Sequence, residues 1–151
     1  MKKTLTNGAI YTIAQVLFDQ NGFRFNKNIK TRMAVRQALK VNMAEIEGKN
    51  KLISEMINEI ITEVHDEYVQ AGKATVNDEQ FVIADKADES EFINEINRRI
   101  HELEIQTMDL ELKEIPQEEL DLYLKRNDGE FTDAELDVLE LFLKGEDDVD
   151  E

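Results

Sequence analysis

The sequence predicts a mainly helical α+β fold with a long helical hairpin or coiled-coil element, a small β-sheet and a capped C-terminal helix. First, residues 29–70 contain no proline and one glycine, and their apolar residues recur at heptad spacing. Second, Met108, Leu110 and Leu112 alternate with charged residues, which is typical of a half-buried strand. Third, residues 132–135 read Thr-Asp-Ala-Glu, a capping box that marks a helix start.

The N-terminal segment predicts a strand followed by a helix. Residues 2–6 read as short and extended, and Asn7-Gly8 is a turn or cap signal. Apolar residues from Ile10 to Leu17 recur at helical spacing, so we expect a first helix over residues 9–19. The extended N-terminal segment and the strand within 105–113 together supply the small sheet.

The long helix dominates the chain and is expected from about residue 29 to Gln70, with Gly48 as a candidate break into two shorter helices. Interleaved heptads give it the seam of a coiled coil, with one polar core position. An apolar seam needs another helix against it, either from this chain or from a second copy. We therefore predict self-association through the seam residues Leu39, Met43, Ile46, Asn50, Ile53, Ile57, Ile60 and Val64.

The rest of the chain predicts shorter elements. Between residues 73 and 88 we expect a hairpin with its turn at Asn77-Asp78, followed by a helix over 88–103. A short helix over 117–124 follows Pro116, and the final helix should stop at Gly145. Length favours one domain, residues 1–145, with a disordered acidic tail over 146–151.

Charge is distributed unevenly along the chain. Residues 1–51 hold 10 Lys/Arg and 3 Asp/Glu, whereas residues 102–151 hold 4 and 19. The net charge of the whole chain is −16. Such asymmetry steers encounters with partners and fixes their orientation. The basic cluster Lys27, Lys30, Arg32, Arg36 and Lys40 is small beside the acidic remainder, which would repel phosphate, so no direct nucleic-acid binding is expected.

Composition excludes several classes of function. The chain has no cysteine, which excludes disulfides, thiolate metal sites and a cysteine nucleophile. No run approaches the length of a membrane span, and no signal peptide is recognisable, so we expect a cytoplasmic protein without a membrane partner. No catalytic constellation or glycine-rich phosphate loop is present, and a non-enzymatic protein without a cofactor is expected.

Two patterns resemble metal sites without completing them. Residues 127–135 match the second half of an EF-hand loop, but Leu124 and Arg126 occupy the positions of the first ligands, so no calcium binding is expected. His101-Glu102 begins a zincin-like motif whose second histidine is missing. We expect His65 and His101 to lie on solvated helix faces.

The long helix also carries a ridge of carboxylates. Glu55, Glu59, Glu63 and Glu67 recur at i, i+4 spacing, which places them in one row about 6 Å apart. A row of this pitch roughly imitates a phosphate backbone, although most charged helix faces are only solvated. The next candidates for an acidic contact surface are Asp133, Asp137 and Glu140 in the final helix.

Three segments carry a resemblance to a known group of proteins. They are Leu-Thr-Asn-Gly-x-Ile-Tyr at 5–11, Phe-Asn-Lys-Asn at 25–28, and Thr-Asp-Ala-Glu-Leu-x-x-Leu-Glu at 132–140. In this layout the chain resembles small acidic bacteriophage and prophage proteins, most of them uncharacterised. The resemblance implies a phage gene product that acts inside a bacterium, and it supplies no catalytic residues.

These observations favour an acidic interaction protein. We expect it to occupy a basic, nucleic-acid-binding surface of a host protein, such as a defence enzyme, and to inhibit that protein. The alternative is a virion or assembly adaptor that uses the charge asymmetry for head-to-tail contacts between copies. The expected partners are accordingly a host or phage protein with a basic surface and a second copy of the chain.

Overall fold

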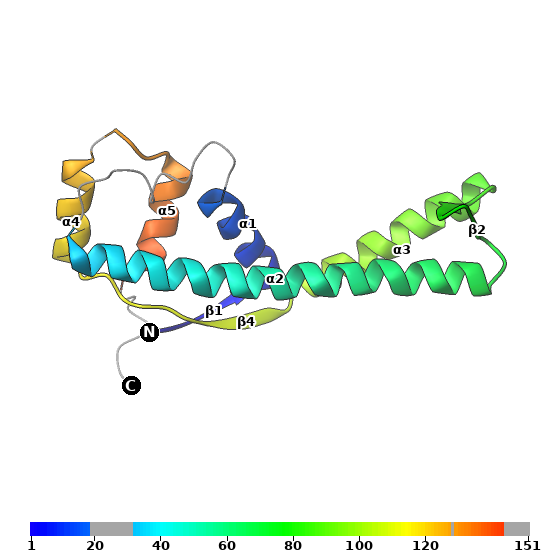
Figure 1. Ribbon diagram of the computed structural model, residues 1–151, viewed down its shortest axis with the longest axis horizontal. Helices are drawn as coiled ribbons and strands as arrows, with labels where there is room; N and C mark the ends of the chain where they lie inside the picture. The colour runs from blue at the N-terminus through cyan, green and yellow to red at the C-terminus, as the bar shows by residue number, and fades with distance from the viewer. Residues whose placement is uncertain (19–31, 128, 144–151) are drawn as a thin grey trace. The chain divides into compact units, whose positions relative to one another are not determined.

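The computed structural model describes residues 1–18, 32–127 and 129–143 (Figure 1). Five helices and four short strands are found in this part of the chain, so the fold is mainly helical, as the sequence predicts. The chain divides into two compact units, Met1–Asn50 with Thr107–Glu151, and Lys51–Gln106. Among the described helices, none is both long and apolar enough to cross a membrane.

The sheet of the first unit confirms the pairing expected from the two distant segments. The strands β1 (Lys2–Thr6) and β4 (Thr107–Glu111) are antiparallel (Figure 1), and Lys2 lies opposite Glu111. The hydroxyl of Thr4 donates a 2.6 Å hydrogen bond to Asp109 across the ladder. This bond and the ammonium of Lys2 lower the pKa of Asp109.

The first helix begins earlier than expected. Helix α1 spans Asn7–Leu17, because the hydroxyl of Thr6 accepts the N–H of Ala9 and caps the helix there. Asn7-Gly8 therefore forms the first turn of α1 and not the cap. The expected last residue, Asp19, lies outside the described residues, as do Phe25–Asn28 and Lys30.

Helix α2 (Met33–Gln70) is one continuous helix of 38 residues, and it passes through Gly48 without a break (Figure 1). Its predicted end is confirmed. Gly72 has a φ of 75°, and the N–H of Lys73 reaches back to the carbonyl of Tyr68 at 2.9 Å. This is a Schellman cap, which satisfies carbonyls that the helix end leaves without partners.

Two polar side chains of α2 bond backbone groups of β4 and of the segment that follows it. Asn42 is fully buried, and its amide donates to the carbonyl of Lys113 and accepts from the N–H of the same residue. One turn further along, Glu45 accepts the N–H of Glu111 at 2.8 Å. An exposed edge strand would otherwise present unpaired backbone groups. The first half of α2 thus lies alongside this segment.

Two short helices close the first unit. Helix α4 (Gln117–Arg126) follows Pro116, and α5 (Asp133–Leu141) begins at the predicted capping box, in which Thr132 and Glu135 bond each other's backbone. The carbonyl of Phe142 accepts the N–H of Ile115 at 2.8 Å and ties the end of α5 to the segment after β4. Gly145 and the acidic tail 146–151 lie outside the described residues.

The second unit consists of the second half of α2, a hairpin and a helix. Strands β2 (Thr75–Asn77) and β3 (Gln80–Val82) are antiparallel, and Asp78 and Glu79 form the turn between them with φ values of 49° and 66°. The turn is thus one residue later than Asn77-Asp78, since Asn77 pairs with Gln80. Helix α3 (Lys86–Glu104) starts earlier than the expected 88–103, because Asp85 caps it.

Candidate functional site

The four carboxylates of the predicted ridge lie on the second half of α2, within the second unit. All four are exposed, and the helix is unbroken along their length. A continuous α-helix holds residues at i, i+4 spacing in one row, so the structure keeps the geometry on which the prediction depends. The surface is made of Glu55, Glu59, Glu63 and Glu67, and we refer to it as the acidic ridge.

One end of the acidic ridge is tied to α3. The guanidinium of Arg99 contacts Glu67 at 2.7 Å and Glu63 at 3.9 Å. The same group binds Glu95 on its own helix at 2.8 Å. Arg99 therefore joins the two helices, and part of the negative charge of Glu63 and Glu67 is neutralised inside the unit.

Arg98 extends this ion network along α3. It binds Glu95 and, one turn further on, Glu102. Hydrogen bonds from Arg98 and Arg99 lower the pKa of Glu95 to about 2. Neither arginine was among the predicted site residues, although their i, i+3 and i, i+4 spacing from Glu95 predicts contacts within the helix. No local pattern predicts the contact of Arg99 with α2, because it depends on how the two helices pack.

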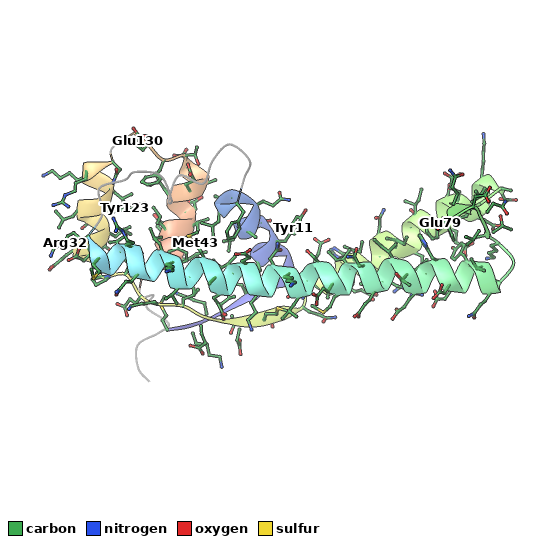
Figure 2. All side chains as sticks on the ribbon, in the orientation of Figure 1. Tyr11, Arg32, Met43, Glu79, Tyr123 and Glu130 are labelled. Atoms are coloured by element: carbon green, nitrogen blue, oxygen red, sulfur yellow. The ribbon has the colours of Figure 1, made fainter. Side chains whose placement is uncertain are left out.

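The other end of the acidic ridge keeps its charge. Within the described part of the chain, neither Glu55 nor Glu59 takes part in an ion pair. An open depression of about 330 Å³ adjoins Glu59 and is lined by Asn58, Glu59, Thr62 and Glu63. Figure 2 shows side chains projecting outward along this length of α2. The depression and the carboxylates beside it can accept hydrogen bonds from Lys or Arg side chains of a partner.

Aromatic packing fixes the hairpin end of this unit. His65 stacks on Phe81 of β3 with 4.1 Å between ring centroids, and Phe92 of α3 lies beside both rings. The expectation that His65 lies on a solvated face is therefore wrong, because the hairpin covers it. Tyr68 meets Phe92 edge to face, and burial, with the neighbouring carboxylate of Glu91, raises the pKa of Tyr68 to about 12. His101 is exposed, as expected.

The seam predicted for self-association is largely covered by the chain itself. Four of its eight side chains are buried, namely Leu39, Ile46, Ile53 and Val64. The other four, Met43, Asn50, Ile57 and Ile60, are half-buried. The amide oxygen of Asn50 is buried and accepts no hydrogen bond from the described residues. A second copy could reach only this remainder of the seam, and self-association through it stays a prediction.

The second set of acidic candidates belongs to the other unit. Asp133, Asp137 and Glu140 all lie on α5 and are exposed. Their neighbour Glu135 is buried, because it closes the capping box. Burial and the charge of Glu135 raise the pKa of Tyr123, which is labelled in Figure 2. The structure thus separates α5 into an exposed acidic face and an interior one.

No metal centre is formed by the described residues, since no three His, Cys, Asp or Glu side chains among them converge on one point. Asp128, the acidic residue before the glycine of the half EF-hand loop, lies outside the described residues. Leu124 and Arg126, which stand where the first calcium ligands would be required, belong to α4.

Comparison with known proteins adds no relative. No protein-family model, no curated protein and no solved structure matches the chain. The proposed function therefore rests on the residues and their geometry.

Proposed function

We propose that the protein is a non-enzymatic acidic interaction protein that binds a basic surface of another protein and blocks it. The observation that carries the proposal is the charged end of the acidic ridge, where Glu55 and Glu59 are exposed on a continuous helix and Glu59 lines an open depression. Such a row, held in fixed geometry, complements a surface that binds nucleic-acid phosphates.

The charge balance of the second unit supports this reading. Residues 51–106 hold 5 Lys/Arg and 14 Asp/Glu, a net charge of −9. Three of those cations, Lys73, Arg98 and Arg99, are already paired with glutamates of the same unit. The field around the unit is therefore negative, and a basic partner is attracted over roughly the Debye length of 10 Å at 0.1 M salt.

The resemblance to phage proteins suggests in which cell the partner is found. The partner would then be a bacterial host protein, with a nucleic-acid-binding enzyme of a defence system as the candidate class. The assembly adaptor remains the alternative, and it differs in its partner, since an adaptor binds copies of itself or virion proteins.

The test compares two charge-reversed variants of the full chain. In the ridge variant, Glu55→Lys and Glu59→Lys, folding should be unchanged within about 0.5 kcal/mol per substitution, because both side chains are exposed. Immobilised wild-type protein should capture a basic nucleic-acid-binding protein from a bacterial lysate, and the ridge variant should not. Affinity for the purified captured protein should fall steeply with added salt.

The control variant carries Glu47→Lys and Glu114→Lys, the same change in net charge at two exposed positions of the first unit. It should capture the same protein as the wild type does. Equal capture by the ridge and control variants would reject the acidic ridge as the contact surface. Capture of the protein's own copies alone would favour the adaptor. Added wild-type protein should also release nucleic acid from the captured partner.

A further inference from the structure

Helix α3 carries an exposed strip of residues whose spacing is symmetrical about its centre. The inner face of α3 packs Phe92 and Ile96 against the core of the second unit. On its outer face, exposed residues follow one another at spacings of 3, 4, 4, 4 and 3, which holds them along one side of the helix. These are Lys86, Glu89, Ile93, Asn97, His101 and Glu104, and we call them the α3 strip.

The ionisable groups of the α3 strip form no ion pair with the part of the chain that the structure describes. Among the described residues, none of Lys86, Glu89, His101 and Glu104 forms an ion pair. Three other cations of the second unit are paired. Lys73, before β2, and Arg98 and Arg99, on α3, all bind glutamates. The strip thus leaves two acids, a lysine and a histidine available to a partner.

The two ends of the strip are placed against the dipole of their own helix. Lys86 is the first residue of α3 and Glu104 is the last. The N-terminus of a helix carries partial positive charge and the C-terminus partial negative charge, so a cation at the start and an anion at the end are both unfavourable. A second α3 running in the opposite direction would reverse both interactions, because each charge would then lie beside the opposite helix end.

We infer that the α3 strip is a docking surface for a second copy of this chain, with the two α3 helices antiparallel about a two-fold axis. In a two-fold interface each contact occurs twice. With the axis level with position 95, Lys86 faces Glu104 of the partner subunit, and Glu89 faces His101 of the partner subunit. The terminal pairs lie about 27 Å apart along the helix, which is 18 residues at 1.5 Å each.

The centre of the strip supplies apolar contact. Ile93 is 48% exposed, and in this register it faces Asn97 of the partner subunit, with the same residue of the second copy about 6 Å away along the helix axis. The half-buried Ile100 lies two turns away on the same side of α3. Burial of these side chains between two helices favours association because apolar area leaves water.

Charge favours a second copy of the chain, and not a basic protein, as the partner that binds the α3 strip. A chain of net charge −16 can approach its own copy only where like charges are sparse. The α3 strip is such a place, since its lysine meets an acid of the other copy in the proposed register. A basic protein would be repelled by Lys86 and would find far more carboxylate on the acidic ridge. This surface is separate from the predicted coiled-coil seam and does not depend on the proposed function.

Sedimentation equilibrium of the full chain tests the inference. The wild type should form a dimer as its concentration rises, and Lys86→Glu should raise the dimer dissociation constant on the order of tenfold, since two like-charge contacts replace two ion pairs. Glu104→Lys should have the same effect. An equimolar mixture of the two variants should recover the wild-type constant, because both contacts of the mixed dimer then pair opposite charges.

Lys51→Glu is the matched control, because Lys51 is an exposed lysine of the same unit and the substitution makes the same change in charge. It should leave the dissociation constant unchanged. Circular dichroism of each variant checks that the helices are intact. A wild type that stays monomeric at several hundred micromolar would overturn the inference. So would equal effects of Lys86→Glu and Lys51→Glu, or a mixture that dimerises no better than either variant alone.

Discussion

At the scale of single residues, Asn42 shows how one amide can bind a backbone segment distant in sequence. Its side chain is fully buried and occupies both the N–H and the carbonyl of Lys113. An asparagine in the middle of a long helix would read from sequence as a solvated position. Its role depends on the segment after β4 lying alongside α2, because Asn42 and Lys113 are 71 positions apart in the sequence.

Replacing this amide should destabilise the first unit. We expect Asn42→Leu to lower the free energy of unfolding by about 2–3 kcal/mol, because the N–H and the carbonyl of Lys113 lose their partner and two hydrogen bonds to a buried side chain are removed. Urea denaturation measures the change. Asn58→Leu, at an exposed position of the same helix, serves as the control and should stay within about 0.5 kcal/mol of wild type. Equal effects at both positions would show that the hydrogen bonds of Asn42 contribute nothing.

Glu95 supplies a second prediction at this scale, concerning acid. Its pKa is lowered to about 2 by hydrogen bonds from Arg98 and Arg99. A carboxyl group whose folded pKa is depressed stabilises the protein above its unfolded pKa of about 4.3, and this contribution is lost as the pH falls toward the folded pKa. We therefore expect a carboxyl NMR titration with its midpoint near 2 for Glu95.

The same linkage predicts the behaviour of a variant. Glu95→Gln should unfold with a shallower loss of stability between pH 5 and pH 2 than the wild type, because it has no carboxyl to protonate. The measurement is the free energy of unfolding at several pH values in that window. A normal carboxyl midpoint near 4 for Glu95, or an unchanged pH slope in the variant, would contradict the ion network.

At the scale of elements, Gly48 is the weakest point of α2 by intrinsic propensity, yet the helix continues through it. Nothing lies within 4 Å of the position where a Cβ would be added. Close packing therefore does not require glycine at this position. The seam residues Ile46 and Ile53, on either side of Gly48, are each buried, and tertiary packing of this kind stabilises a helix beyond its intrinsic propensity.

Because a Cβ at position 48 would meet no other atom, we expect alanine there to stabilise the protein. Gly48→Ala should raise the free energy of unfolding by roughly 0.5–1 kcal/mol, the difference in helix propensity. Gly72→Ala is the matched contrast, since Gly72 has a φ of 75° in the helix cap, and it should cost about 1–2 kcal/mol. Chemical denaturation of both variants provides the test. Destabilisation by Gly48→Ala would show that α2 needs to bend at this position.

At the scale of the whole molecule, the acidic surfaces differ in how much of their charge is neutralised by ion pairs. Arg98 and Arg99 neutralise part of the carboxylate on α2 and α3, while Glu55 and Glu59 remain without ion partners in the described chain. The two proposed surfaces are therefore distinguishable by experiment. Reversal of Glu55 and Glu59 should leave dimerisation unchanged, and Lys86→Glu should leave capture of a basic partner unchanged.

The sequence alone determined the elements that depend on local patterns. The long helix, the capping box at Thr132 and the strand around Leu110 follow from periodicity and short-range hydrogen bonds, which act within a few residues. The acidic ridge follows in the same way from the helical repeat. All four of its carboxylates are exposed in the structure.

Only the tertiary structure decided which of those surfaces remain open. It covered half of the apolar seam, placed His65 under β3, and brought Arg99 to Glu67 from another helix. Each of these contacts joins residues that are distant in sequence, and their pairing depends on how helices and strands pack together. Periodicity shows that a residue lies on one face of a helix, and packing determines what that face meets.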